Sequence, residues 1–132
     1  MQLFKNEFVN IELRENNFLY VKWTDKTADM SVDFFKQVNL WYIDYFDKYA
    51  ITSFMINTQD FKFAIIPEVQ EWVGTQIIPK VIASGLKKLA FIVSEEIIAQ
   101  LSIEQTMSES KSDEFTLLYF DNEAKANTWL NS

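Results

Sequence analysis

Apolar and polar residues alternate in the first part of the chain. Residues 8–13 and 18–22 both follow this alternation, and the polar segment 15–17 separates them. A period of two places successive side chains on opposite faces of a β-strand. The pattern therefore predicts an antiparallel hairpin near the N-terminus.

The period changes to that of a helix in residues 27–49. Large apolar residues recur there every three or four positions, at Phe35, Val38, Tyr42, Phe46 and Tyr49. Ser31 precedes them and is a favoured N-cap residue. We expect an amphipathic helix that rests its apolar stripe on a sheet.

Three short apolar runs predict buried strands, at residues 53–57, 89–93 and 115–120. A helix should begin at Pro67, be kinked or restarted at Pro79 and end at Gly85. Further helices are expected at residues 95–107 and 122–130, with a polar loop at 108–113.

Strands that alternate with helices form right-handed crossovers and a sheet covered on both faces. The 132 residues, with 48% hydrophobic content and no linker or repeat, fit one domain spanning residues 1–132. The predicted fold class is α/β, with a mostly parallel sheet of four to five strands, an N-terminal antiparallel hairpin and helices on its faces.

Charge and composition limit the classes of partner that the chain is expected to bind. The chain carries 19 acidic and 12 basic residues, a net charge of −7, which repels phosphate-rich partners and argues against nucleic acid. No stable membrane insertion and no secretory signal are expected from the pattern. Cysteine is absent, so no disulfide framework is expected, and the cytoplasm is the default location.

Reactive side chains are scarce. Without histidine and cysteine the chain lacks the usual neutral-pH base, the thiolate nucleophile and most zinc ligands. Carboxylates could still serve as acid and base or bind a metal, at Asp60, Glu68, Glu71, Glu95 or Glu96. Because any chain with this many acids offers such pairs, we expect no catalytic residue, no metal site and no cofactor. Ser94 with Glu95 and Glu96 is best interpreted as a helix start rather than an anion site.

The segment after the strand 53–57 is the best candidate for a site. It is longer than most strand-to-helix connections and mixes amides, a carboxylate and aromatic rings. With a tryptophan of the next helix it predicts an apolar ligand cleft formed by Asn57, Thr58, Gln59, Asp60, Phe61, Phe63 and Trp72. The alternative is that its apolar members only cap the core.

The helix 27–49 carries more apolar residues than one stripe requires. Phe34, Trp41 and Tyr45 widen one flank, and Leu40 and Ile43 lie toward the other. Such residues predict an interface with a protein partner or a second copy, as in a homodimer. Coverage by the hairpin or the last helix is the alternative.

Several segments together resemble a known family. Pro67-Glu68-Val69-Gln70-Glu71-Trp72, Ile78-Pro79, the run 83–93 (ASGLKKLAFIV), Tyr119-Phe120-Asp121, Glu123-Ala124 and Trp129-Leu130 are similar to small bacterial STAS-like proteins. These resemble the sporulation anti-sigma factor antagonist in fold. The resemblance implies a binding module without catalysis, in some members switched by serine phosphorylation and in a related branch holding lipids.

The phosphorylation switch is not expected in this chain. Where the antagonists carry serine at the helix entrance, residues 64–67 read Ala-Ile-Ile-Pro and offer no hydroxyl, while Thr58 is better explained as a turn residue. Three hypotheses follow. The first is a non-catalytic STAS-like interaction module, the second a carrier of a lipid or other apolar small molecule near the loop 57–66, and the third a carboxylate-dependent enzyme.

Overall fold

A computed structural model describes residues 1–15, 17–94 and 115–132 of the chain. Its strands are β1 (Gln2–Lys5), β2 (Val9–Arg14), β3 (Phe18–Trp23), β4 (Ser53–Asn57), β5 (Lys88–Ile92) and β6 (Thr116–Phe120). Its helices are α1 (Val32–Tyr49), α2 (Pro67–Trp72), α3 (Ile78–Ala83) and α6 (Glu123–Leu130), with a 3-10 helix Asp25–Asp29 and a π-helical segment Val73–Ile77. The helix and loop predicted at residues 95–113 lie outside the described residues.

The strands form one mixed sheet of six strands in sequence order. The pairs β1–β2 and β2–β3 are antiparallel, and β3–β4, β4–β5 and β5–β6 are parallel. This confirms the N-terminal hairpin and the α/β class. The prediction of four to five strands is wrong because β1 was missed. That strand has only four residues, both ends are exposed, and a bulge breaks its register, so it shows no sustained alternation.

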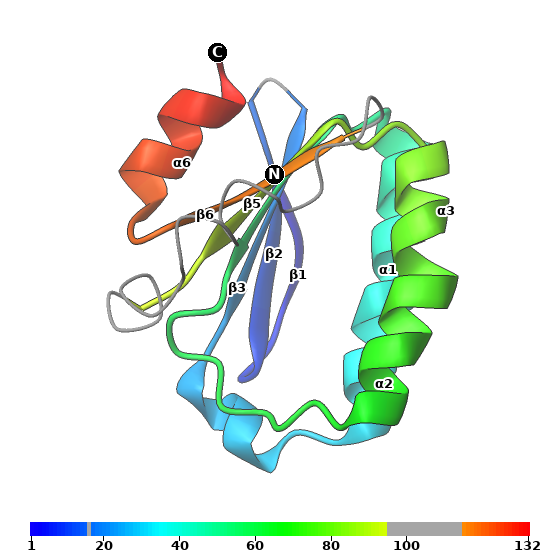
Figure 1. Cartoon of the computed structure of the whole chain (residues 1–132). Helices are drawn as coiled ribbons and strands as arrows, with labels where there is room; N and C mark the ends of the chain where they lie inside the picture. The colour runs from blue at the N-terminus through cyan, green and yellow to red at the C-terminus, as the bar shows by residue number, and fades with distance from the viewer. Residues whose placement is uncertain (16, 95–114) are drawn as a thin grey trace.

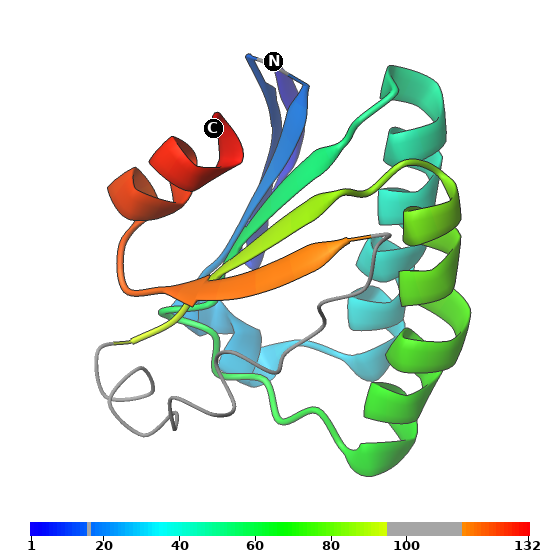
Figure 2. The same cartoon turned by 45° about the horizontal axis from the view of Figure 1, so that its top comes forward.

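Helices cover both faces of the sheet (Figures 1 and 2). The helix α1 and the helix formed by α2, the π segment and α3 lie side by side on one face, and α6 lies on the other. Leu19, Val21 and Trp23 of β3 belong to the large core under α1. Phe18 and Tyr20 of the same strand belong to the smaller core under α6. Successive side chains of β3 therefore contribute to two cores, one on each face of the sheet.

The predicted start of α1 is confirmed by its cap. The hydroxyl oxygen of Ser31 accepts a hydrogen bond from the amide of Phe34 at 3.1 Å, which satisfies one of the free amides of the first turn. The helix ends at Ala50, which adopts the left-handed conformation with φ of 52°. The following strand β4 is buried along its whole length.

The second helical segment begins at Pro67 and has a defect at Pro79, as the sequence predicts. The backbone widens into the π segment, where the amide of Ile78 donates to the carbonyl of Val73, five residues back. Proline cannot donate to the carbonyl four residues earlier and clashes with it. The wider turn accommodates that defect, so the helix passes through Pro79 to Ala83.

Gly85 closes the helix with a Schellman motif. The amide of Gly85 donates to Ile82 at 3.1 Å, and that of Leu86 donates to Val81 at 3.1 Å. Gly85 has φ of +124°, and a Cβ atom there would lie 3.3 Å from the carbonyl oxygen of Ile51. This position therefore needs glycine.

The two glycines give a matched test. Gly85→Ala should lower the free energy of unfolding by about 1–3 kcal/mol through backbone strain. Gly74→Ala should raise it by about 0.5–1 kcal/mol, because Gly74 is helical and a Cβ there meets nothing within 4 Å. Urea unfolding measures both values, and two changes of the same sign would contradict this assignment.

Candidate functional site

The large core contains a cavity of about 430 Å³ between the sheet and the two helices that cover it. Its described wall consists of Trp23, Phe35, Asn39, Tyr42, Phe54, Ile56, Thr58, Phe61, Ile65, Gln70, Val73, Ile77, Ile78, Val81, Leu86, Leu89, Phe91, Val93 and Tyr119. Most of these side chains are apolar, and seven carry aromatic rings. Small-molecule pockets have this composition and fall within about 300–1,000 Å³.

The cavity reaches the carboxyl ends of the parallel strands. Trp23 ends β3, Val93 follows β5, and Thr58 and Phe61 come from the loop 58–66 that leads from β4 to α2. Figure 1 shows this loop crossing from the sheet to the helices, which stand away from the strands at that end. Open α/β sheets commonly bind ligands beyond these strand ends.

Aromatic contacts hold this end of the cavity together. The rings of Trp23 and Phe61 meet edge to face at 5.5 Å, and Trp23 lies 5.8 Å from Phe35. Phe63 stacks on Phe35 at 5.3 Å. The amide of Lys62 donates to the buried hydroxyl of Thr27 at 2.8 Å, which ties the loop to the 3-10 helix. The loop is therefore packed against the start of α1.

Two polar residues of α1, Asn39 and Tyr42, are part of the mainly apolar wall of the cavity. Asn39 is 5% exposed, and its Nδ2 donates to the carbonyl of Phe35 at 2.9 Å. Tyr42 is buried, and its ring meets that of Phe54 edge to face at 4.9 Å. Burial raises the pKa of Tyr42 far above its usual value, so the hydroxyl stays protonated. No described residue that lines the cavity is charged.

The structure brings part of the predicted cleft to this cavity. Thr58 and Phe61 line it, and the hydroxyl of Thr58 donates to the carbonyl of Ile92 at 2.9 Å. Phe63 packs behind Phe35, and Asp60 is exposed. Trp72 does not line the cavity; its ring lies 5.1 Å from the Lys36 ammonium.

The two residues of the predicted cleft with amide side chains, Asn57 and Gln59, stabilise the loop. The backbone amide of Gln59 donates to Oδ1 of Asn57 at 3.0 Å. The side-chain amide of Gln59 donates to the backbone carbonyl of Asp121 at 2.8 Å. These bonds fix the first turn of the loop against the end of β6. Asn57 and Gln59 therefore position the loop and do not line the cavity.

Comparisons with known proteins were made for the whole chain. No protein family, curated protein or solved structure matches it.

A polar cluster on the other face of the sheet joins three elements. Oε2 of Glu123, at the start of α6, accepts from the Tyr20 hydroxyl at 2.5 Å and from Nδ2 of Asn57 at 2.6 Å. The Arg14 guanidinium lies 3.6 Å from the centre of the Tyr20 ring. Tyr20 and Asn57 are 3% and 2% exposed. The cluster fastens α6 to the sheet.

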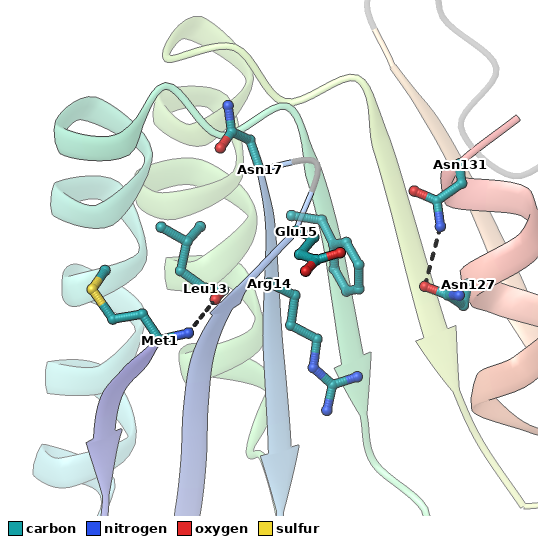
Figure 3. Close-up of a pocket in the computed structure, with 8 residues that line it drawn as sticks. Met1, Leu13, Arg14, Glu15, Asn17, Asn127 and Asn131 are labelled. Carbon is teal, nitrogen blue, oxygen red and sulfur yellow. Dashed lines mark hydrogen bonds between the residues drawn. The ribbon is translucent and has the colours of Figure 1, made fainter.

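A second hollow, of about 600 Å³, lies on the surface between the hairpin turn and the end of α6. Figure 3 shows Arg14 and Glu15 of the hairpin across from Asn127 and Asn131. Arg14 already pairs with Glu12 at 3.1 Å and covers Tyr20. Most residues of this hollow are exposed, so it offers less burial to a ligand than the apolar cavity.

The residues predicted as an interface on α1 are mostly partly buried within the chain. Trp41 lies 4.7 Å from the ring of Phe4 in β1, and Phe34 lies 5.6 Å from Phe8. Ile43 and Tyr45 also pack on the large core, while Leu40 is 43% exposed. The N-terminal hairpin region thus supplies much of the contact surface that these aromatic residues require.

The carboxylates considered for chemistry do not converge where the chain is described. Asp60, Glu68 and Glu71 are exposed, and Glu95 and Glu96 lie outside the described residues. Among residues 1–15, 17–94 and 115–132, no group of three or more acids could hold a metal ion. No helix within those ranges is both long and apolar enough to cross a bilayer.

Because two tyrosines are buried, we expect the folded protein to lose stability at alkaline pH. Burial, assisted by Glu123 for Tyr20, raises the hydroxyl pKa of Tyr20 and Tyr42 above the usual value near 10. The unfolded chain therefore loses these protons first. The stability that each phenol contributes is complete below about pH 10 and falls above it by up to about 1.4 kcal/mol per pH unit.

Urea unfolding at pH 9, 10 and 11 measures this effect. Tyr20→Phe and Tyr42→Phe should each make the free energy of unfolding less dependent on pH above 10. If the two buried-site variants show the same dependence as the original chain, the assignment is wrong.

Proposed function

We propose that this protein is a non-catalytic binding protein that holds an apolar small molecule in the cavity between its sheet and its two-helix layer. The single observation that carries the proposal is the wall of this cavity. It surrounds about 430 Å³ with mainly apolar side chains, and the described part of the wall has no charge. Burial of apolar ligand surface there would be favourable by about 25 cal/mol per Å² before the cost of association.

The backbone around the cavity supports this proposal. Val73 and Ile77, the ends of the π segment, both line it, and π-helical turns frequently occur at functional sites. The loop 58–66 is packed by aromatic contacts and hydrogen bonds, so it provides one wall without large rearrangement. A volume of this size with a mainly apolar wall favours a ligand site.

We also propose that the chain is a STAS-like module, as the resemblance over about residues 18–131 implies. A mixed sheet with helices on both faces supports this relationship at the level of fold class. An interaction with a protein partner or a second copy through α1 is the companion hypothesis, for which Leu40 is the most exposed of the predicted contacts. Cytoplasmic location stays a prediction from the sequence.

The proposal is tested with protein purified from its own cells without denaturation. Native mass spectrometry should show one small molecule bound per chain, and solvent extraction of the same sample should release it. Protein refolded from urea is the matched control and should lack the extra mass. A native spectrum containing only the bare chain, with nothing in the extract, would contradict the proposal.

A further inference from the structure

We infer that the ligand of the apolar cavity is an uncharged aromatic or aliphatic molecule that carries a hydroxyl group. This inference rests on the proposed function, because it names the class of molecule that the same cavity takes. It is carried by Asn39 and Tyr42, the two buried polar residues that α1 contributes to the wall.

Asn39 supplies a hydrogen-bond acceptor. Its Nδ2 is used by the carbonyl of Phe35, as in many helices where a side chain bonds back one turn. Among the described residues no hydrogen bond to Oδ1 of Asn39 is found, and Asn39 lines the cavity. A side-chain amide oxygen can accept two hydrogen bonds, so Oδ1 is available to a donor in the cavity. A ligand donor would satisfy it.

Tyr42 supplies a hydrogen-bond donor. Its side chain lines the cavity from α1, and among residues 1–15, 17–94 and 115–132 no hydrogen bond from its hydroxyl to an acceptor is found. A phenol hydroxyl can donate one hydrogen bond, so it is available to an acceptor in the cavity. A phenol is protonated at neutral pH even at its usual pKa near 10, so this donor is present there.

The spacing of Asn39 and Tyr42 along α1 places the acceptor and the donor close to each other. Residues three apart on a helix lie on the same face, with their Cβ atoms about 5–6 Å apart. A ligand hydroxyl can donate to Asn39 and accept from Tyr42 through a single oxygen atom. A carboxylate can only accept, and it would bring an unpaired charge to a wall whose described residues have no compensating cation.

The rest of the wall favours a ring system as the apolar part of the ligand. Phe54 meets Tyr42 edge to face at 4.9 Å, and Phe91 lies 5.7 Å from Tyr119 in a stacked pair. Aromatic rings add favourable edge and offset contacts to the burial of their area. A two-ring phenol is therefore a suitable probe.

Three probes of the same frame test the inference by calorimetry at pH 7. They are 4-hydroxybiphenyl, biphenyl and biphenyl-4-carboxylate. We expect 4-hydroxybiphenyl to bind about tenfold more tightly than biphenyl, because biphenyl can form no hydrogen bond with Oδ1 of Asn39 or with the Tyr42 hydroxyl. The carboxylate should bind more weakly than biphenyl.

A double variant shows whether the preference comes from these residues. In Asn39→Leu/Tyr42→Phe the preference for the phenol should vanish while biphenyl still binds. The matched control Asn127→Leu/Tyr49→Phe makes the same changes away from the cavity and should keep the preference. Equal binding of phenol and biphenyl, tightest binding of the carboxylate, or a preference that survives in the double variant would each overturn the inference alone. Binding of none of the three probes would overturn the proposed function with it.

Discussion

Replacing Val81 by phenylalanine should weaken the binding of biphenyl about 20-fold. Val81 is buried in α3 and faces the cavity, so the larger ring would occupy space that the ligand needs. A ligand ring of about six atoms, at about 0.3 kcal/mol per atom, contributes about 1.8 kcal/mol, which corresponds to about 20-fold in Kd. Titration calorimetry with the purified variant measures the change.

The control for this prediction is Val32→Phe, the same substitution at the exposed first position of α1 outside the cavity. It should leave the Kd for biphenyl unchanged. Val73→Phe, on the π segment, repeats the test from a second position in case the first variant does not fold. Unchanged binding in both cavity variants, with normal circular dichroism, would show that biphenyl binds elsewhere.

The second large effect is expected at Glu123. Removing its carboxylate by Glu123→Ala leaves the Tyr20 hydroxyl and Nδ2 of Asn57 buried without an acceptor. Each unpaired buried donor costs about 1–3 kcal/mol. We expect the free energy of unfolding to fall by about 2–4 kcal/mol, and the amides of α6 to exchange faster with solvent.

Asp121→Ala is the matched control, because it also removes one carboxylate near the start of α6. Asp121 pairs with Lys125 at 3.0 Å, and both side chains are partly exposed. Such a surface pair contributes no more than about 1 kcal/mol. Urea unfolding and hydrogen exchange compare the two variants, and equal losses of stability would contradict a special role for Glu123.

The same cluster links the two faces of the sheet. Asn57 donates to Glu123 through its amide nitrogen and accepts from the backbone of Gln59 through its oxygen. Gln59 lies in the loop 58–66, which carries Thr58 and Phe61 to the cavity wall. Loss of Glu123 should therefore loosen one wall of the cavity as well as α6.

Most of the fold could be predicted because its elements have a regular period. The strand 53–57, the helix with its Ser31 cap and the helix start at Pro67 all appear where the sequence places them. The π segment could not be predicted as such. A proline inside a helical pattern indicates a defect, but how the backbone absorbs it depends on packing against α1.

The candidate site was harder to predict than the fold. The loop after β4 was indicated by its length, and Thr58 and Phe61 do line the cavity. Trp72 was wrongly expected there, since helical spacing places it beside Lys36 at the outer part of the layer. Asn39 and Tyr42 were missed as site residues because both lie within an apolar stripe that predicts only a core.

One signal in the sequence could have found Asn39. It is a polar residue next to Val38 and one turn after Phe35, on the face of α1 that must be buried. A buried asparagine in such a stripe needs a partner or lines a cavity. Nothing in the sequence pattern alone distinguishes those two outcomes, since they depend on how far the helices stand from the sheet.

If the cavity in the large core binds an apolar molecule, nuclear Overhauser effects should connect 4-hydroxybiphenyl with methyl groups of the cavity wall in the labelled protein. We expect contacts from the ligand rings to Ile56, Val81 and Leu89, which line the cavity from the sheet and α3. Contacts to Leu13, in the surface hollow, or no contacts at saturating ligand would contradict the claim.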